Sequence, residues 1–487
     1  MKNIKKIFLI IGLFFVITLS VNAKDEVFKY DWSKGLKSEL SYRDVPYNTT
    51  IEFKDGYVNS DVYFYDGPNT RIQRYSFKGE TLATTTLKYT VVYSMLGIDS
   101  NIYVIAYDME KDLFALFKFD DKLNKIDELE LPSELRDNIL NINYILKIYG
   151  INYISVYEDE IVFVDPMDSK IYITDKNFED TQTKNLSENL IKKYYPDVYY
   201  GETLLNDLMD DYSKYISIDF NDKKLVTGGV KSSCEINATS AFIDNSRTAS
   251  CDTKGVLLLT DDKGNKIWFK ELEEYNIIAN ARFVNGYIVA VGYSLLEVPR
   301  LRDAYPEFKS DILIFDMDGN LVQKIEGEDD TRYLLIEPSK AGFTINKTSG
   351  YCRDIDLNPI MPHGESPYDC EMKLEAYYLP RKIKTKVNGE GTINVVDNAR
   401  YGDEIIFEAI PKEGYVIDSI KITDSNGEVV SYSNNKFTMS ASDVLIEAVF
   451  LPKNPETNDM AIISVFLITA LMFGVMLINY KKVKFLS

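Results

Sequence analysis

Short apolar runs separated by polar turns dominate the chain between residues 27 and 380. The runs are rich in Tyr, Ile, Val and Phe, and they end at clusters of Asp, Asn, Gly and Lys. Alternation of apolar and polar positions is typical of a strand with one covered face, and β-branched and aromatic residues favour that conformation. The pattern therefore predicts an all-β domain over residues 24–380.

The same order of elements recurs along this domain. In the clearest copy, four apolar runs follow one another at 279–284, 287–293, 311–315 and 321–325. The copy before it has its runs at 215–220, 225–230, 256–259 and 267–269. Asn285-Gly286 joins the first two runs of the clearest copy, and Gly takes the positive φ of a tight hairpin at no steric cost. We expect each copy to be a four-stranded antiparallel unit.

Earlier copies centre on expected turns between third and fourth strands at Gly79, Lys122 and Asp168, which are 43 and 46 residues apart. A sixth copy starts at Tyr333 and ends at Tyr378. Four-stranded units with a period of about 40–55 residues indicate a β-propeller. We expect six blades, with seven as the alternative; a β-sandwich or a stacked β-solenoid is the other fold compatible with the pattern.

Two segments depart from the repeat. Residues 27–40, with Ser33-Lys34-Gly35 in the middle, read as the last two strands of a unit, and pairing of this N-terminal piece with the final blade would remove exposed edges. Apolar residues have helical spacing near 187–211, which predicts two short helices inserted between the third and fourth units as a cap or a contact surface.

The fourth unit contains Asp261-x-x-Gly264-x-x-x-Trp268. This segment resembles the blades of quinoprotein-like propellers, whose repeats often end in that way. Trp occupies the position in this unit alone among the copies compared.

The pattern changes after residue 380. Five short motifs follow in order: Gly389-x-Gly391-x-Ile393, Gly402-Asp403, Pro411-x-x-Gly414-Tyr415, Phe437-Thr438-Met439 and Ala448-x-Phe450. They resemble the divergent internalin B-type repeat of bacterial surface proteins, with Ser440 where that family usually has Pro. The resemblance implies a small β-grasp-like module over 381–451. A single copy suggests a spacer between the propeller and an anchor.

Both ends of the chain are apolar. Residues 1–23 combine a basic start, an apolar core and small residues up to Ala23, which predicts a signal peptide that is removed on export. The run 460–478 carries no charge and as a helix would span roughly 28 Å, which predicts a transmembrane helix over 460–480. The basic tail 481–487 is expected in the cytoplasm, with the rest outside.

The linker 452–459 contains a candidate cleavage motif, which comprises Asn454, Pro455, Glu456, Thr457 and Asn458. The order of motif, apolar span and basic tail resembles a Gram-positive sortase sorting signal of the Asn-Pro-x-Thr-Asn type. The resemblance implies that a sortase cleaves after Thr457 and joins the protein to peptidoglycan. An uncleaved membrane anchor behind a polar linker is the alternative.

Charge narrows the possible partners. Residues 24–457 carry 49 Lys and Arg against 74 Asp and Glu, a net charge of −25. Such a surface repels phosphate backbones and anionic headgroups, so nucleic acid is not an expected partner. Cations, basic proteins and neutral glycans remain possible partners.

Four cysteines pair by position, Cys234 with Cys251 and Cys352 with Cys370. An exported chain meets an oxidising environment, so we predict two disulfides, each contributing about 3 kcal/mol by the chain-entropy model. Both pairs fall between the second and third strands of their units, where they staple long loops or pre-order them for recognition. A zinc site is the alternative, with His363, the only histidine, inside one of these loops.

The sequence carries no recognisable catalytic constellation or cofactor motif. Asp316-Met317-Asp318-Gly319-Asn320 begins like an EF-hand, but its Gly is in the fourth position and no Glu follows in the twelfth, so we interpret it as a hairpin turn. We expect a surface-anchored binding or adhesion protein that contacts an extracellular protein or glycan. The alternatives are a membrane-anchored structural or sensory ectodomain, and an extracellular quinoprotein-like or hydrolytic enzyme.

Overall fold

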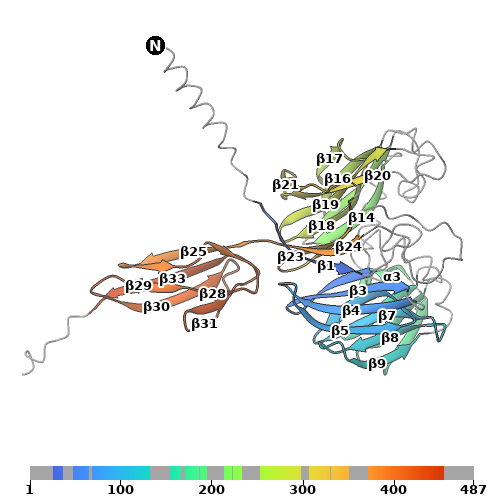
Figure 1. Ribbon diagram of the computed structural model, residues 1–487, viewed down its shortest axis with the longest axis horizontal. Helices are drawn as coiled ribbons and strands as arrows, with labels where there is room; N and C mark the ends of the chain where they lie inside the picture. The colour runs from blue at the N-terminus through green and yellow to red at the C-terminus, as the bar shows by residue number, and fades with distance from the viewer. Residues whose placement is uncertain are drawn as a thin grey trace, which may run out of the picture. The chain divides into compact units, whose positions relative to one another are not determined.

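The structure is a computed structural model. It describes residues 26–36, 48–64, 68–131, 154–165, 170–185, 187–194, 213–221, 223–232, 253–297, 307–329, 331–349 and 371–453. The chain divides into two units, Met1–Pro380 and Arg381–Ser487. Strands dominate both units (Figure 1).

The described part of the first unit forms six four-stranded antiparallel sheets. Sheet 1 contains β2 (Asn48–Phe53), β3 (Gly56–Phe64), β4 (Pro68–Ser76) and β5 (Thr81–Lys88). Sheet 2 contains β6 (Thr90–Ile98), β7 (Asn101–Asp108), β8 (Leu113–Phe119) and β9 (Lys125–Glu130). Sheet 3 contains β10 (Ile154–Tyr157), β11 (Glu160–Asp165), β12 (Lys170–Asp175) and β13 (Thr181–Asn185).

The next two sheets repeat this order. Sheet 4 contains β14 (Ser213–Asn221), β15 (Lys224–Ser232), β16 (Thr253–Asp261) and β17 (Lys266–Leu272). Sheet 5 contains β18 (Ile277–Val284), β19 (Tyr287–Glu297), β20 (Glu307–Phe315) and β21 (Leu321–Ile325). The strands predicted for the fourth and fifth units are confirmed, and β19 and β20 extend well into the loop expected from 294 to 309.

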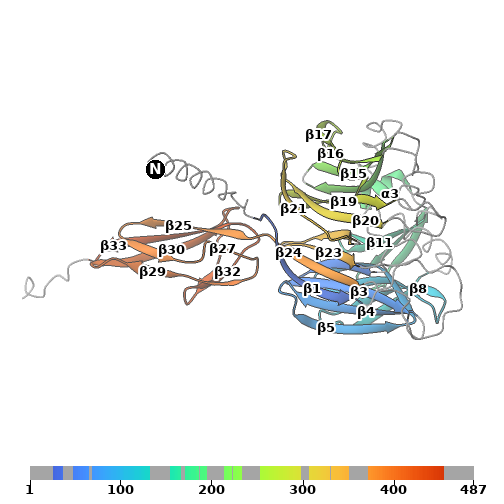
Figure 2. The same ribbon diagram turned by 45° about the horizontal axis from the view of Figure 1, so that its top comes forward.

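Sheet 6 takes its strands from both ends of the unit. It contains β22 (Arg332–Pro338), β23 (Gly342–Ser349), β24 (Glu371–Tyr378) and β1 (Lys29–Leu36). β1 pairs antiparallel with β24, from Lys29 opposite Tyr378 to Leu36 opposite Met372 (Figure 2). The predicted pairing of an N-terminal strand with the last unit is confirmed.

The prediction of two strands around Ser33-Lys34-Gly35 is wrong for the described residues. β1 runs through these residues without a turn, and Gly35 lies opposite Lys373. A Cβ atom added at Gly35 would have no neighbour within 4 Å, so this Gly marks neither a turn nor a tight contact.

The fourth strand is the least buried strand of each sheet. Every residue of β18 is buried, whereas every residue of β13 is exposed. The first strands also contact one another in sequence: β2 with β6, β6 with β10, β14 with β18, β18 with β22, and β22 with β2. First strands therefore share an interior and fourth strands face solvent, which is a β-propeller-like arrangement.

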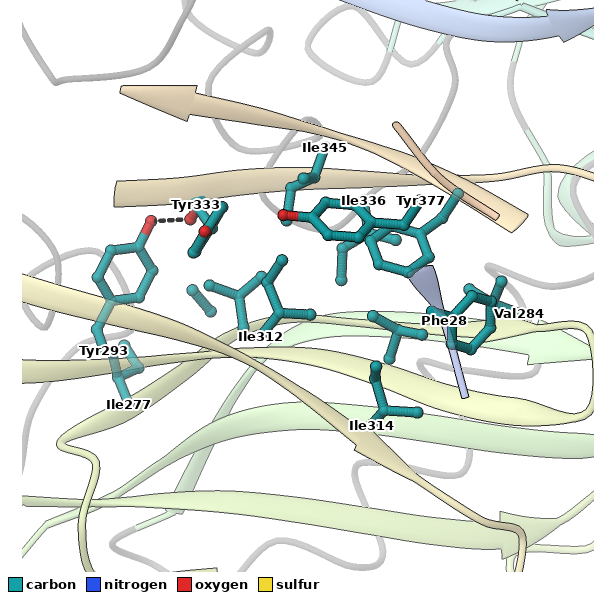
Figure 3. Close-up of a cluster of buried hydrophobic side chains, with 14 of the residues drawn as sticks. Phe28, Ile277, Val284, Tyr293, Ile312, Ile314, Tyr333, Ile336, Ile345 and Tyr377 are labelled. Atoms are coloured by element: carbon teal, nitrogen blue, oxygen red, sulfur yellow. Dashed lines mark hydrogen bonds between the residues drawn. The ribbon is translucent and has the colours of Figure 1, made fainter. Parts of the chain in front are cut away.

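Phe28, next to β1, enters the core shared by sheets 5 and 6 (Figure 3). Its ring meets Phe343 edge-on, with the ring centroids 5.2 Å apart. The Gln323 side chain of β21 accepts from the Phe28 N–H and donates to its carbonyl, both at 2.8 Å. Nearby, the Tyr293 hydroxyl donates to the Tyr333 carbonyl at 2.5 Å. The start of β1 is thus fixed to sheet 5 as well as to sheet 6.

Trp32 joins β1 to sheet 1. Its indole Nε1 donates to the Phe77 carbonyl at 2.9 Å, and its ring packs so closely on Gly79 that an added Cβ would lie 2.6 Å from Trp32 Cγ. Gly79 also has a positive φ of 79°, which favours glycine.

Trp268 repeats this contact between sheets 4 and 5. Its Nε1 donates to the Met317 carbonyl at 3.0 Å, and its ring lies against Gly319. We expected such a Trp in the fourth unit alone, but Trp32 makes the same contact from sheet 6. The sequence repeat did not reveal it, because the last strand of sheet 6 comes from the N-terminus, ahead of all the other strands.

One turn geometry joins the third and fourth strands of sheets 2 to 5. An Asp carboxylate accepts the N–H groups of the residues two and four positions later; these aspartates are Asp120, Asp175, Asp261 and Asp316. The residue three positions later has a positive φ in each case. The prediction of a hairpin turn at Asp316 is confirmed, and no cluster of metal-ligating side chains occurs among the residues described.

The prediction of a third-to-fourth turn at Asp168 is wrong. Asp168 falls between the second and third strands of sheet 3 and lies outside the described residues. The third-to-fourth turn follows Asp175, and Phe178 takes the positive φ of 64° there. The turn escaped prediction because it lacks the Gly that marks the equivalent position in sheets 1, 4 and 5.

One helix is described between sheets 3 and 4, α3 (Glu188–Tyr194). Leu190 and Tyr194 pack against a cluster of sheet 3 side chains that comprises Val162, Ile171 and Ile173. The first predicted helix of the insertion is therefore confirmed, and the second falls outside the described residues.

The second unit is smaller. Its strands are β25 (Arg381–Asn388), β26 (Gly391–Asn394), β27 (Asn398–Ala399), β28 (Glu404–Ile406), β29 (Glu408–Pro411), β30 (Tyr415–Asp424), β31 (Tyr432–Ser433), β32 (Lys436–Thr438) and β33 (Val444–Pro452). The largest sheet has the order β27-β25-β33-β30, in which β25 and β33 are parallel. Ile405 and Phe407 lie in its core, as their alternation predicts.

No helix within the described ranges is long and apolar enough to cross a membrane. The predicted signal peptide 1–23, the transmembrane helix 460–480 and the tail 481–487 all lie outside those ranges. They remain predictions from the sequence.

The Trp32 contact leads to a stability prediction. Trp32→Ala removes a buried ring and its hydrogen bond, so the free energy of unfolding of the first unit should fall by about 3–5 kcal/mol. Tyr30→Ala is the matched control, because Tyr30 lies on the same strand and is 54% exposed. Urea denaturation followed by circular dichroism measures both, and equal midpoints for the two variants would contradict the role given to Trp32.

Candidate functional site

Five ionisable side chains gather where first strands run into the turns that follow them. They are Glu52 of β2, Asp219 of β14, Arg282 of β18, Glu337 of β22, and Lys340 just after β22. They come from sheets 1, 4, 5 and 6, which the first-strand contacts bring together. We call this set the first-strand cluster.

Each first strand is the end strand of its sheet and so has one edge without a strand partner. Backbone N–H groups on such an edge need other acceptors. Asp219 Oδ2 accepts from the Phe283 N–H of β18 at 2.7 Å, and Asn280 Oδ1 accepts from the Ile336 N–H of β22 at 3.2 Å. Side chains of one sheet therefore satisfy the free edge of the next.

Two acids of the cluster have a basic neighbour. Glu52 Oε2 accepts from the Lys340 backbone N–H at 3.0 Å, and Lys340 Nζ lies 3.8 Å from Glu52 Oε1. Arg282 Nη1 lies 3.9 Å from Asp219 Oδ1. Burial still raises the pKa of Glu52 above its ordinary value, because desolvation of the carboxylate outweighs the attraction of Lys340.

Glu337 differs from these two acids. It makes no hydrogen bond or ion pair with any residue that the structure describes. Desolvation by the surrounding protein raises the pKa of Glu337 to about 8; Arg282 opposes this shift, whereas Asp219 and Glu52 add to it. Glu337 as a whole residue is half-buried.

Two buried polar groups beside Glu337 also lack partners. Asn280 is 1% exposed, and its Nδ2 is unpaired, although its Oδ1 is bound to the residue next to Glu337. Thr344 lies opposite Glu337 in the β22–β23 register, so the two side chains share a face. Thr344 is 0% exposed and its Oγ1 is unpaired. Glu337 thus lies beside two buried donors that have no partner among the described residues.

The second unit matches a known family. Residues 382–454 match the divergent InlB B-repeat domain. This match confirms the resemblance seen in the sequence motifs, and we call the second unit the B-repeat module.

Residues 25–222 match DUF4221, a domain of unknown function. This range covers β1, sheets 1 to 3 and the start of sheet 4. No curated protein sequence matches the chain significantly.

Solved structures similar to this chain include a DUF4221 family member from Bacteroides vulgatus, with 9% identity, a TM-score of 0.35, and coverage of 72% of this chain and 97% of the other. Streptogramin B lyase has 9% identity, a TM-score of 0.28, and coverage of 72% and 100%. Drosophila Semaphorin 2a has 6% identity, a TM-score of 0.28, and coverage of 87% and 99%. The architecture given above rests on strand pairing and not on these likenesses.

The site residues expected from the sequence lie outside the described ranges. These are Ala23, Cys234, Cys251, Cys352, Cys370, Asn454, Pro455, Glu456, Thr457 and Asn458, together with His363. The two disulfides and the sorting motif, which lies between the B-repeat module and the apolar run, therefore stay predictions.

Sequence reasoning missed the first-strand cluster. Four first strands place a charged residue between two apolar ones: Ile51-Glu52-Phe53, Ile218-Asp219-Phe220, Ala281-Arg282-Phe283 and Ile336-Glu337-Pro338. A charge repeated just before the first turn of four units was a usable signal. Acidic residues are so common in this chain that a single Asp or Glu in a strand did not indicate a site.

The raised pKa of Glu337 predicts a pH-dependent stability. The folded protein holds the Glu337 proton more tightly than the unfolded chain, where Glu titrates near 4.5. Ionisation of Glu337 therefore lowers the free energy of unfolding progressively from about pH 4.5 to pH 8. Glu337→Gln removes this loss, so the variant should gain stability over the wild type as pH rises from 5 to 9.

Denaturant unfolding of both proteins at several pH values measures the difference. Glu371→Gln is the control, since Lys373 lowers the pKa of Glu371 and the sign of its pH effect is opposite. Parallel stability curves for the wild type and Glu337→Gln would show that Glu337 titrates normally.

Proposed function

We propose that this chain is an exported surface protein in which a six-bladed β-propeller binds an extracellular ligand and the B-repeat module acts as a spacer to the anchor. The observation that carries the proposal is the order of parts along one chain: a predicted signal peptide, a β-propeller-like unit, a match to the divergent InlB B-repeat domain and a predicted sorting motif.

Strand pairing supports six blades. The described residues of the first unit form six four-stranded sheets, and β1 supplies the fourth strand of the last one. The contact of β22 with β2 then places sheet 6 beside sheet 1, as ring closure requires.

Surface display is supported by the sequence of both ends and by the B-repeat match. The predicted signal peptide ends at Ala23, and the predicted sorting motif surrounds Thr457. A module of the InlB B-repeat type between propeller and motif suits a spacer. We propose that sortase attaches the chain to peptidoglycan.

Fractionation of the producing bacterium tests display and attachment. The wild-type chain should stay in the cell-wall fraction after detergent extraction, and protease added to intact cells should remove the first unit. Thr457→Ala should move the chain into the detergent-soluble membrane fraction, whereas the matched change Thr438→Ala in the B-repeat module should not.

Protection of the chain in intact cells, with digestion only after lysis, would contradict surface display. Detergent extraction of the wild type together with Thr457→Ala would contradict sortase attachment while leaving membrane-anchored display in place.

A further inference from the structure

One side of the largest sheet in the B-repeat module points away from the core of the module. The strands β25, β33 and β30 of this sheet lie next to one another (Figure 1). Their inward side chains, which include Ile383, Ile422 and Ile446, belong to the buried core. Side chains alternate along a strand, so the residues between these point outward.

Lysines are concentrated on the outward side. Lys382, Lys384 and Lys386 alternate along β25, and all three are exposed. Lys421 of β30 is exposed as well; it lies opposite Glu447 of β33, which lies opposite Lys386. We call the four lysines the lysine face. Given the spacing of residues and strands in a sheet, their Cα atoms fit within roughly 17 Å.

Carboxylates balance only part of this positive charge. Glu447 Oε1 accepts from Lys386 Nζ at 2.8 Å and from Asn388 Nδ2 at 2.7 Å. These hydrogen bonds, with the nearby charge of Lys421, hold the pKa of Glu447 below its ordinary value. Asp443, at the end of the face, accepts from a backbone N–H at the start of β25. The other three ammonium groups make no hydrogen bond or ion pair with any residue that the structure describes.

The lysine face belongs to a chain that is acidic elsewhere. Residues 24–380 carry 40 Lys and Arg against 62 Asp and Glu, whereas residues 381–453 carry 9 against 11. Charges at physiological ionic strength act over only about 8 Å. A ligand that touches the lysine face therefore meets a positive surface, although the whole chain is negative.

The position of the B-repeat module limits what this face can meet. β33, the middle strand of the face, ends at Pro452, and the predicted sortase cleavage follows Thr457. The residues 454–457 that lie between the described module and the cleavage point span at most about 14 Å when fully extended. Sortase attachment would therefore hold the module among the polymers of the cell wall.

We propose that the lysine face binds the anionic phosphodiester polymers of the cell wall. Ammonium groups attract phosphate oxygens as point charges, and a row of lysines can neutralise several phosphates of one flexible chain and release their counterions. This inference rests on the proposed sortase attachment. It gives the B-repeat module a second task besides that of a spacer, namely non-covalent contact with the wall.

Binding of the purified exported chain to isolated cell walls tests the proposal. Wild type should bind untreated walls and should lose this binding after hydrofluoric acid has removed the phosphodiester polymers. The double variant Lys384→Gln/Lys421→Gln should bind untreated walls about tenfold more weakly. The control Lys412→Gln/Lys436→Gln removes the same charge from the module but outside the lysine face, and it should bind like wild type.

Glu447→Gln predicts a gain that misfolding cannot imitate. This change removes the acid between Lys386 and Lys421 and releases Lys386 from its ion pair, so binding to walls should strengthen several-fold. Titration with poly(glycerol phosphate) at several salt concentrations measures the same contact in solution. The slope of log K against log salt concentration should be about −3 for wild type and about −1.4 for the double variant.

Three results would overturn the proposal. The first is equal binding of wild type and the double variant to untreated walls. The second is equal binding of wild type to walls before and after extraction of the phosphodiester polymers. The third is tighter binding to phosphatidylglycerol vesicles than to poly(glycerol phosphate), because the same charges would then serve a lipid surface.

Failure of this inference can be told from failure of sortase attachment. Washing at high salt releases ionic contacts but leaves a covalent bond intact. If wall linkage resists salt while the double variant binds walls like wild type, attachment stands and the role of the lysine face falls. If salt removes all of the wild-type chain from the wall, sortase attachment falls and the ionic contact stands.

Discussion

The first unit depends on the backbone pairing of β1 with β24. This pairing joins residues near position 30 to residues near position 375 and completes the fourth strand of sheet 6. Without it, β24 would present an unpaired edge of N–H and C=O groups. The entropy lost in closing so long a loop grows only slowly with length, so hydrogen bonds and buried side chains along one strand can offset it.

β1 does more than supply hydrogen bonds. Phe28 packs in the core of sheets 5 and 6, and Trp32 packs on the turn of sheet 1. One strand therefore holds three sheets together. Trp268 in sheet 4 and Gln323 in sheet 5 each lie directly after a register shift in the fourth strand. Each side chain makes a hydrogen bond to the backbone of the next sheet, Trp268 to Met317 and Gln323 to Phe28. An indole and an amide side chain thus both link a fourth strand to the neighbouring sheet.

The predictability of the fold follows from how each segment is buried. The strands 279–284 and 287–293 could be predicted, because both sides of the hairpin are covered and Asn285-Gly286 marks the turn with positive φ. The third-to-fourth turn of sheet 3 could not, because Phe178 takes a conformation that sequence patterns assign to Gly. Gly35 misled in the opposite direction, since tertiary pairing overrides its preference for turns.

The first-strand cluster was hidden for another reason. Its members are separated by up to 288 positions, as in the bond between Glu52 and Lys340, and only the contacts between first strands bring them together. A charged residue in a first strand looks like an ordinary polar position until the free edge of the neighbouring strand is seen beside it. The same contacts between first strands that bury the interior therefore bring these charged side chains together.

Hydrogen exchange of the folded chain tests this dependence most directly. If β1 closes the unit, its amides should be protected to the same degree as those of β24 and should become exposed together with them as denaturant is added. Fast exchange in residues 29–36 while residues 371–378 stay protected would show that β1 is a loosely attached tail, and the account of closure would be wrong.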